Sequence, residues 1–217
     1  MTRLRIKICG VTREADAVEA AEQGADALGL NFYARSPRCI DRQKAAAILK
    51  ELPPFVEPVA LFVNQACRAI RDQLQGLDPI RTIQWHGENL DCTDLASYRY
   101  ILAFPVRDEA SLGAILDFVR RARSVGSPPA AILVDAAVPG AYGGTGQKAP
   151  WKLLADFRPE VPLILAGGLT PDNVAEAVRL VRPYAVDVAS GVESAPGVKD
   201  AELMRRFIGN ALAAAAP

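Results

Sequence analysis

Residues 4–10, Leu-Arg-Ile-Lys-Ile-Cys-Gly, have the pattern of a short buried strand that ends at a glycine-containing loop. The residues that follow, 12–23, have the composition of a helix, with Thr12 as the expected N-cap and Gly24 directly after its end. This stretch therefore predicts one strand–helix unit with a thiol, Cys9, at the carboxyl end of its strand.

The same strand–helix unit recurs to the end of the chain, with Asp41 and Thr170 as further expected N-caps. Further strands are expected at 27–32, 58–63, 80–85, 100–106, 130–135, 162–166 and 185–190, and helices at 42–52, 66–75, 111–125, 151–157, 171–181 and 201–215, with a weak short helix at 90–97. The strands are apolar and lack a solvated face, so they need cover on both sides.

About eight such units predict an α/β fold, a single (β/α)₈ TIM barrel that forms one domain over residues 1–217. The structural alternative is an open, doubly wound sheet. That fold would want a GxGxxG motif after the first strand, and residues 9–12, Cys-Gly-Val-Thr, do not provide one.

The composition argues against nucleic-acid and membrane partners. Basic and acidic residues number 25 each in a chain of 217, so no net charge would attract nucleic acid or an anionic membrane. The basic residues are scattered and not interleaved with aromatic ones. No apolar run approaches membrane-spanning length. Hydrophobic residues make up 50% of the chain, which is enough for a large core.

The cysteines and the histidine indicate the compartment and exclude some chemistries. Cys9, Cys39, Cys67 and Cys92 are widely separated and form no CxxC pair, and residues 1–5 lack a signal-peptide pattern. We therefore expect a cytoplasmic protein with reduced thiols. His86 is the one histidine in the sequence, which argues against a zinc site or a Ser/His/Asp triad, so no metal is expected.

Strand alternation predicts which polar side chains point into the barrel. In the first strand the isoleucines at positions 6 and 8 should face the helices, which leaves Lys7 and Cys9 facing the axis. The same parity turns Asp135 and Asp187 inward. Because the first and last strands of a closed barrel are neighbours, Lys7 and Asp187 are expected to form a buried ion pair.

Gln84 and His86 share the inward face of the fourth strand, so six polar side chains would converge on one axis. Three of them also have a structural interpretation: Cys9 as a small buried hydrophobe, His86 as a satisfied core histidine and Asp135 as a structural carboxylate. Together they are too polar for a plain core. A thiol whose ionisation Lys7 would favour, and a carboxyl, are suited to moving protons.

Two glycine-containing segments follow the last two strands: Gly167-Gly168 and Ser190-Gly191. In a (β/α)₈ barrel the loops after strands seven and eight frequently bind a phosphate through exposed backbone N–H groups. Glycines can also merely turn the chain, but two such loops at adjacent positions favour a phosphate site.

Two other loops have both a functional and a structural interpretation. Residues 142–146, Tyr-Gly-Gly-Thr-Gly, would make either a mobile cover over the site or a plain surface connection. Arg35 or Arg38, after the second strand, could bind a carboxylate or phosphate through two hydrogen bonds, although most loop arginines are simply solvated.

Seven motifs, in order along nearly the whole chain, resemble the phosphoribosylanthranilate isomerase family. They are Lys7-Ile8-Cys9-Gly10, Ser36-Pro37-Arg38, Gln84-Trp85-His86-Gly87, Leu133-Val134-Asp135, Gly143-Gly144-Thr145-Gly146, Ala166-Gly167-Gly168-Leu169 and Asp187-Val188-Ala189-Ser190-Gly191-Val192-Glu193. Residues 196–200, Pro-Gly-Val-Lys-Asp, also look like the family's segment before the last helix. Each motif alone is weak, and the set is highly specific.

The resemblance implies an Amadori rearrangement of N-(5-phosphoribosyl)anthranilate in tryptophan biosynthesis, with no metal or organic cofactor. It implies Asp135 as the general acid that opens the ribose ring and Cys9 as the general base that removes the C2′ proton. It implies Arg38 as the residue that holds the anthranilate carboxylate. The implied substrate-binding residues are Lys7, Arg38, Gln84, His86, Gly144, Gly167, Gly168, Asp187, Ser190 and Gly191. The expected partner is this small phosphoribosyl substrate, and the chain is expected to be a monomer or a homodimer.

Three other functions are alternatives. The related histidine-pathway isomerase has an Asp where Cys9 stands, and indole-glycerol-phosphate synthase uses a Lys and Glu set that is not recognisable here. A non-catalytic phosphosugar-binding barrel would keep the glycines and lose the acid or base. Two departures from the family pattern, Trp85 and residues 149–151, Ala-Pro-Trp, touch no proposed catalytic group.

Overall fold

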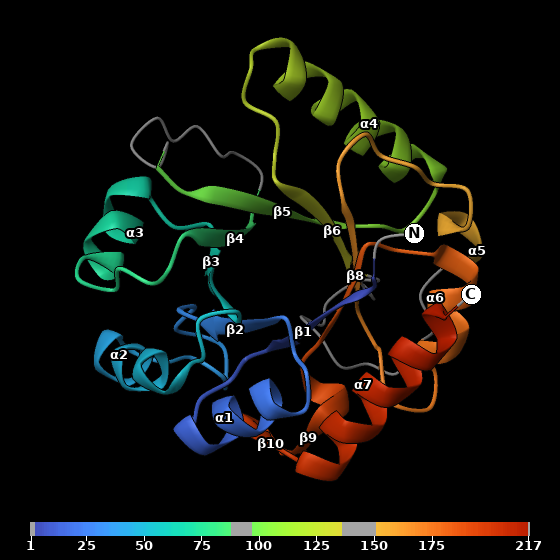
Figure 1. Ribbon diagram of the computed structural model, residues 1–217. Coiled ribbons are helices and arrows are strands. Elements are labelled where there is room, and N and C mark those ends of the chain that lie inside the picture. Colours follow the sequence, from blue (N-terminus) through green and yellow to red (C-terminus); the bar gives the residue numbers. More distant parts are fainter. Residues whose placement is uncertain (1–2, 88–96, 136–150, 217) are drawn as a thin grey trace.

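The computed structural model describes residues 3–87, 97–135 and 151–216, and its eight parallel strands close into a barrel (Figure 1). The strands are β1 (Arg5–Cys9), β2 (Ala27–Asn31), β3 (Glu57–Val63), β4 (Thr82–His86), β5 (Arg99–Pro105), β6 (Ala131–Asp135), β7 (Leu163–Ala166) and β8 (Ala185–Val188). Each strand pairs with the next, and β8 pairs with β1. The predicted α/β barrel is confirmed.

Helices surround the barrel in chain order (Figure 1). They are α1 (Glu14–Glu22), α2 (Arg42–Glu51), α3 (Cys67–Leu74), α4 (Glu109–Ser124), α5 (Trp151–Leu154), α6 (Val174–Val181) and α7 (Ala201–Ala215). The predicted cap at Asp41 is confirmed, since its carboxylate accepts a hydrogen bond from the backbone N–H of Lys44 at 2.8 Å. Residues 90–96 of the weak helix predicted at 90–97 lie outside the described residues.

Two predicted N-caps are wrong, since neither Thr12 nor Thr170 caps the helix that follows it. The Thr12 hydroxyl donates to the carbonyl of Gly197, so α1 begins at Glu14 without a side-chain cap. At Thr170 the backbone N–H donates to the side chain of Asn173, and α6 begins only at Val174. Helix α5 is also shorter than predicted and ends at Leu154.

A small hairpin between β8 and α7 was not predicted. Strand β8 ends at Val188, and a 3₁₀ turn, η2 (Ser190–Val192), leads into the antiparallel pair β9 (Glu193–Ala195) and β10 (Val198–Lys199). The hairpin directly precedes α7, and it lies beside α1 in Figure 1.

Apolar residues form two separate clusters, one on each side of the strands. The larger lies between the strands and the helices and includes Ile6, Ile8 and Trp85. The smaller lies inside the barrel and includes Val59, Leu133, Ile164 and Ala185. The predicted strand parity is confirmed, since alternate residues reach the two clusters.

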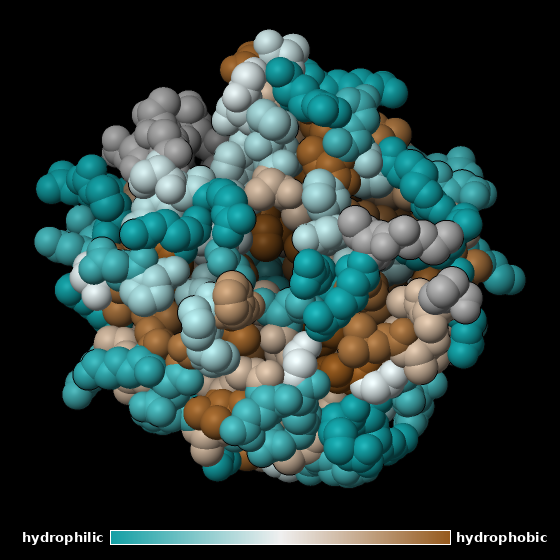
Figure 2. All heavy atoms as spheres, in the orientation of Figure 1, coloured by the Kyte–Doolittle hydropathy of each residue, from teal (hydrophilic) through white to brown (hydrophobic). Residues whose placement is uncertain are grey.

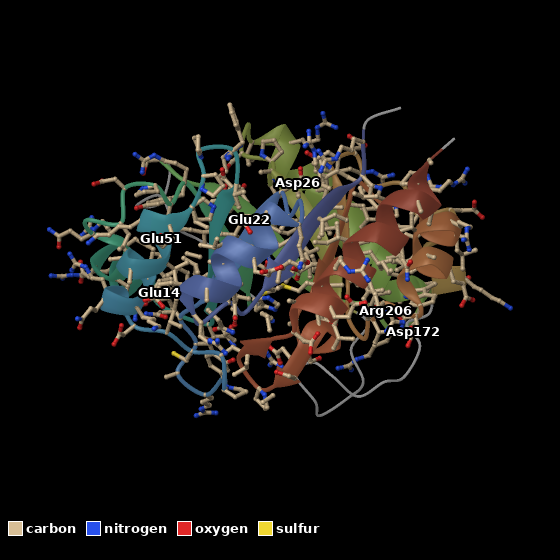
Figure 3. The ribbon with its side chains drawn as sticks, turned by 60° about the horizontal axis from the view of Figure 1, so that its bottom comes forward. Glu14, Glu22, Asp26, Glu51, Asp172 and Arg206 are labelled. Atoms are coloured by element: carbon tan, nitrogen blue, oxygen red, sulfur yellow. The ribbon has the colours of Figure 1, made fainter. Side chains whose placement is uncertain are left out.

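The outer surface is polar. In Figure 2, hydrophilic residues cover most of the rim of the face shown, and hydrophobic residues are visible between the helices and toward the centre. Labelled side chains such as Glu14, Glu51 and Asp172 lie on the outside of the helical layer (Figure 3). Within the described ranges, no helix is long and apolar enough to cross a membrane.

Candidate active site

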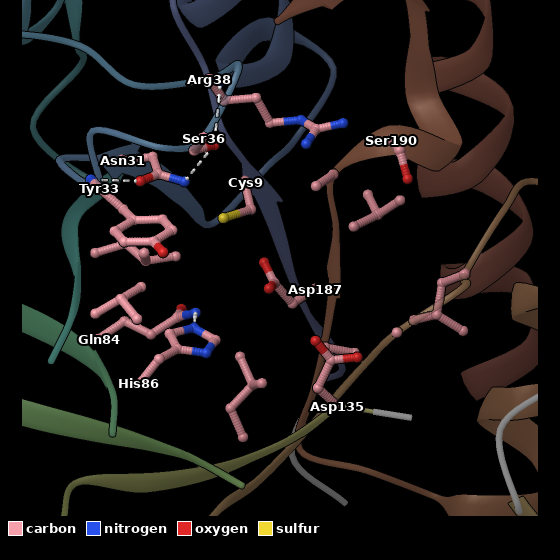
Figure 4. Close-up of a pocket in the computed structure, with 18 of the residues that line it drawn as sticks. Cys9, Asn31, Tyr33, Ser36, Arg38, Gln84, His86, Asp135, Asp187 and Ser190 are labelled. Carbon is pink, nitrogen blue, oxygen red and sulfur yellow. Dashed lines mark hydrogen bonds between the residues drawn. The ribbon is translucent and has the colours of Figure 1, made fainter. Parts of the chain in front are cut away.

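A cavity of about 430 Å³ lies at the carboxyl ends of the barrel strands, where the loops begin. Most of the side chains and loops that the sequence singled out line it: Cys9, Arg38, Gln84, His86, Asp135, Gly167, Gly168, Asp187, Ser190 and Gly191. Figure 4 shows how several of these residues surround a common space. The inward convergence that strand parity predicted is therefore confirmed.

Lys7 lies one layer deeper and does not line the cavity. Its ammonium donates to Asp187 Oδ1 at 2.7 Å, and only 4% of the Lys7 side chain is exposed. The residues are register partners on β1 and β8, so the predicted ion pair is confirmed. Burial lowers the pKa of Lys7, but Asp187 and Cys9 together more than offset this, and the net pKa is raised.

Gly29 makes room for this arrangement. It is the register partner of Cys9 on β2, and a Cβ at this position would come within 2.7 Å of the Cys9 sulfur and 3.1 Å of the Lys7 nitrogen. A side chain here would displace the thiol of Cys9 or the ammonium of Lys7. The position therefore requires a glycine, because both groups lie close to its backbone.

Cys9 is buried, and burial raises the pKa of its thiol above the ordinary value. Lys7 acts in the expected direction, but Asp187 opposes it, so the pair leaves little net charge to favour the thiolate. Lys7 therefore favours the thiolate as expected, but burial and Asp187 outweigh it, and the net pKa of the thiol stays raised. A second cation, Lys199, also lowers the pKa of the thiol.

Asp135 ends β6, on the opposite side of Asp187 from Cys9 in the view of Figure 4. Burial, together with the negative charge of Asp187, raises its pKa to about 6. A carboxyl with this pKa keeps a protonated fraction near neutral pH, and it can therefore act as an acid.

Gln84 and His86 form a hydrogen-bonded pair on the wall formed by β4, with Gln84 Nε2 and His86 Nε2 2.8 Å apart. Burial, with Lys7 nearby, lowers the pKa of His86 to about 4, so its imidazole is neutral near pH 7. Gln84 Oε1 is buried and has no hydrogen-bond partner among the described residues. Gln84 itself is among the residues that line the cavity.

The loop after β2 holds Arg38 against the cavity. Asn31 donates to the hydroxyl of Ser36 at 3.1 Å, and the same hydroxyl accepts from the backbone N–H of Arg38 at 3.1 Å (Figure 4). The Arg38 side chain donates twice to Glu193, at 2.8 and 2.6 Å. Asn31 and Ser36 were missed as site residues, although the inward parity of Asn31 at its strand end could have indicated it.

The loops after β7 and β8 meet at Gly191. A Cβ on Gly191 would overlap the carbonyl oxygen of Leu169, so the two loops are in direct contact only because this residue is glycine. Gly167 and Gly168 have positive φ angles of 88° and 64°. These three glycines, with Ser190, therefore form one continuous backbone surface at the rim of the cavity.

Some of the predictions fall elsewhere. Gly144 and the glycine-rich loop around it lie outside the described residues, as does Cys92. Cys9 and Cys39 are free thiols as predicted, but Cys67 is disulfide-bonded, so the prediction of a reduced thiol is wrong there. Sequence spacing without a CxxC motif carries no signal for such a bond, because tertiary structure alone brings distant cysteines together.

Comparisons with known proteins decide among the functions left open by the sequence. A family model described as N-(5'phosphoribosyl)anthranilate (PRA) isomerase matches residues 6–210. The chain belongs to this isomerase family. Its resemblance to that family, first indicated by the motifs, is confirmed, and the match favours it over the histidine-pathway isomerase.

Individual relatives agree with the family match. The N-(5'-phosphoribosyl)anthranilate isomerase of Trichlorobacter lovleyi is 47% identical over 210 residues, which cover 96% of this chain and 98% of the relative. The protein of the same name from Geobacter sulfurreducens is 48% identical over 206 residues, covering 94% and 97%.

Solved structures of the family superpose on the isomerase along nearly its whole length. The phosphoribosyl anthranilate isomerase of Thermotoga maritima has a TM-score of 0.85 at 40% identity and covers 96% of this chain and 98% of its own. A family structure in complex with reduced 1-(o-carboxyphenylamino)-1-deoxyribulose 5-phosphate has a TM-score of 0.81 at 37% identity, with the same coverage. The isomerase is thus an enzyme of tryptophan biosynthesis, as predicted.

Proposed function

We propose that Asp135 and Cys9 carry out the two proton transfers of the isomerisation. Asp135 donates a proton to the ribose ring oxygen as the bond between C1′ and that oxygen breaks, and the amine lone pair forms the C1′ iminium. Cys9, as thiolate, removes the C2′ proton, and the electrons of that bond form an enolamine. Tautomerisation of the enolamine then gives the ketone, so the atoms rearrange without net oxidation.

The observation that carries this proposal is the placement of an acid and a base around one cavity. Cys9 ends β1 and Asp135 ends β6, and these strands are not neighbours in the barrel. The two groups can therefore approach a bound ribose from different directions. The raised pKa of Asp135, about 6, supports its role as the acid.

The remaining residues of the cavity are proposed to bind the substrate. The backbone surface formed by Gly167, Gly168, Ser190 and Gly191 would bind the phosphate, and Arg38 the anthranilate carboxylate. The neutral His86 and its neighbour Gln84, which both line the cavity, would contact the ribose hydroxyls. Lys7 and Asp187 would act from below, through the charge that they place beside Cys9.

The test measures the turnover of N-(5'-phosphoribosyl)anthranilate that is generated in situ. Turnover is monitored through the loss of the substrate's fluorescence. Each proton-transfer group contributes about 10²–10⁴-fold, so Cys9→Ala and Asp135→Asn should each lower kcat at least about a hundredfold with the fold intact. Near-normal activity in either variant would refute the assigned role. Substrate binding by the wild-type protein without turnover would instead favour the non-catalytic phosphosugar-binding barrel.

We also infer that the chain acts in the cytoplasm, where thiols such as those of Cys9 and Cys39 stay reduced, and that it forms one cooperative domain, since one barrel accounts for the described strands. A single unfolding transition by circular dichroism and by fluorescence would support this. The assembly is proposed to be a monomer or a homodimer. One solved family structure is of monomers generated from a dimeric Thermotoga maritima isomerase. Light scattering after gel filtration distinguishes the two states.

A further inference from the structure

Two buried charged side chains lie beside the active site without entering its cavity: Lys199 of β10 and Glu193 of β9. The Lys199 ammonium donates to Glu193 Oε1 at 2.8 Å, to the Cys9 carbonyl oxygen at 2.6 Å and to the Ala189 carbonyl oxygen at 3.1 Å. All three donors of the ammonium are thus used. One of them holds the backbone of the proposed general base.

Glu193 also holds Arg38. Its carboxylate accepts from Arg38 Nε at 2.8 Å and from Nη2 at 2.6 Å, and only 4% of the Glu193 side chain is exposed. A guanidinium has five N–H donors, and this contact uses one edge of the plane. The edge formed by the two terminal nitrogens is left for a second carboxylate, and Arg38 lines the cavity.

The charges in this cluster do not balance. Within the part of the chain that the structure describes, the side chains of Arg38 and Lys199 share a single carboxylate, that of Glu193. Burial raises the pKa of Glu193, but hydrogen bonds from Arg38 and Lys199 more than offset this, so the carboxylate stays ionised. One positive charge is left over at the wall of the cavity, where an anionic substrate group would match it.

The hairpin that carries both residues is fixed to the start of α1. The Thr12 hydroxyl donates to the Gly197 carbonyl at 2.5 Å, and Asp16 accepts from the backbone N–H of Lys199 at 3.0 Å. The two contacts join the turn and the second strand of the hairpin to residues that directly follow β1. The cluster is therefore held on a rigid base.

We propose that Glu193 and Lys199 are positioning residues for the isomerisation: Glu193 orients Arg38 toward the carboxylate of the substrate, and Lys199 fixes both Glu193 and the backbone of Cys9. This inference rests on the proposed function, in which Arg38 binds that carboxylate and Cys9 is the base. Neither residue touches the substrate, because neither lines the cavity.

The test of Glu193 compares Glu193→Gln with Glu202→Gln. Glu202 accepts two hydrogen bonds from Arg205, at 2.8 and 2.6 Å, on the surface of α7. It therefore makes the same kind of two-bond contact with an arginine as Glu193 does, but away from the active site. Glu193→Gln should raise KM about tenfold with kcat nearly unchanged, because the guanidinium loses its fixed orientation. Glu202→Gln should change neither constant.

N-(5'-phosphoribosyl)aniline, a substrate that lacks the carboxylate, gives a second measurement. The ratio of kcat/KM for the two substrates would not change if a variant merely lost part of its structure. The wild-type preference in kcat/KM for the carboxylated substrate should fall about tenfold in Glu193→Gln and persist in Glu202→Gln. If the Gln variant loses its native circular dichroism, Glu193→Asp makes the same comparison, since it keeps the charge and withdraws it from Arg38.

The test of Lys199 is the pH profile of kcat/KM. Cys9 is also influenced by Lys7 on its own strand, Asp187 on β8 and Arg38 in the loop after β2, and all three stay in place. Lys199→Met removes a positive charge that lowers the pKa of the Cys9 thiol, so the alkaline limb of the profile should move to higher pH. Lys199→Arg keeps the charge and should leave this limb in place.

The outcomes separate the two levels of inference. A wild-type protein that turns over neither substrate would refute the proposed function, and the positioning role with it. An active wild type whose Glu193→Gln variant behaves like Glu202→Gln, or whose Lys199→Met variant keeps the wild-type pH profile, would overturn the positioning role alone.

Discussion

Lys7 and Asp187 join the first and last strands of the barrel through a 2.7 Å ion pair directly below the thiol of Cys9. Their opposite charges act on the site in opposite directions. Asp187 raises the pKa of Cys9 and of Asp135, and Lys7 lowers the pKa of Cys9. The pair thus joins the two strands that close the barrel and, after burial, is the main influence on the pKa values of the two proposed catalytic groups.

Asp187→Asn should destabilise the fold by about 3–5 kcal/mol, because it leaves the Lys7 ammonium buried without its anion. It should also lower the pKa of Asp135 below about 6, since Asp187 contributes to raising it. Urea unfolding and the pH profile of kcat/KM measure the two effects.

The matched control is Asp172→Asn. Asp172 pairs with Arg206 at 2.6 Å on the surface (Figure 3), with 79% of the Asp172 side chain exposed. Loss of this pair should cost less than about 1 kcal/mol. Equal losses of stability in the two variants would contradict the role given to the buried pair.

The pH profile of kcat/KM should rise up to about pH 6, stay flat above it, and fall again only at alkaline pH. Activity needs protonated Asp135, with a pKa of about 6, and ionised Cys9, with a pKa above its ordinary 9.0. Between these values each gain in thiolate offsets a loss of protonated carboxyl. The reactive form is then a small minority of the free enzyme.

A profile measured with substrate well below KM checks this. A limb near pH 6 that moves to lower pH in Asp187→Asn would support the assignment to Asp135. A rise in kcat/KM that continues unbroken from pH 5 to pH 8 would contradict it.

Asp135→Asn should abolish activity yet stabilise the fold at pH 8. The carboxyl titrates at about 6 in the folded protein against an ordinary value of 3.8, so its ionised form destabilises the native state. A shift of about two units corresponds to about 3 kcal/mol, present above pH 6 and absent below pH 4.

Urea unfolding of the wild type and the variant at pH 8 and pH 4 measures this difference. Asp117→Asn is the control, since Asp117 is exposed on α4. A stability difference that is the same at both pH values would show that ionisation of Asp135 is not its cause.

Gly191→Ala should raise KM about tenfold, because its Cβ would force the loop after β8 away from the carbonyl of Leu169 and open the proposed phosphate site. Gly113→Ala on α4 is the control, since a Cβ there meets nothing within 4 Å, and it should stabilise the helix by about 0.5–1 kcal/mol. Inorganic phosphate should inhibit the wild type more strongly than Gly191→Ala. Equal inhibition of both would argue against a phosphate site at Gly191.

Strand alternation and the repeated strand–helix unit were enough to predict the barrel and the inward direction of Cys9, Asp135 and Asp187. These predictions succeed because a parallel strand buried on both faces leaves each residue only two directions, and the apolar clusters decide between them. Helix starts were less predictable: Thr12 has the right chemistry for a cap, but Gly197, far along the chain, takes its hydroxyl.

The protonation of the site could not be predicted in the same way. Lys7 stands two residues from Cys9, which pointed to a thiolate, but the counter-charge of Asp187 and burial together reverse the outcome. Likewise nothing local shows that Glu193 and Lys199 are buried, since charged residues in a short segment before a helix are usually solvated.

The sequence by itself determined the fold, the family and the residues that face the barrel axis, because all three depend on residue type and on periodicity along the chain. Tertiary structure alone decided the raised pKa values of Asp135 and Cys9 and the cluster of Arg38, Glu193 and Lys199. The physical reason is that desolvation and Coulomb interaction depend on distances between residues up to 190 positions apart, which local pattern does not encode.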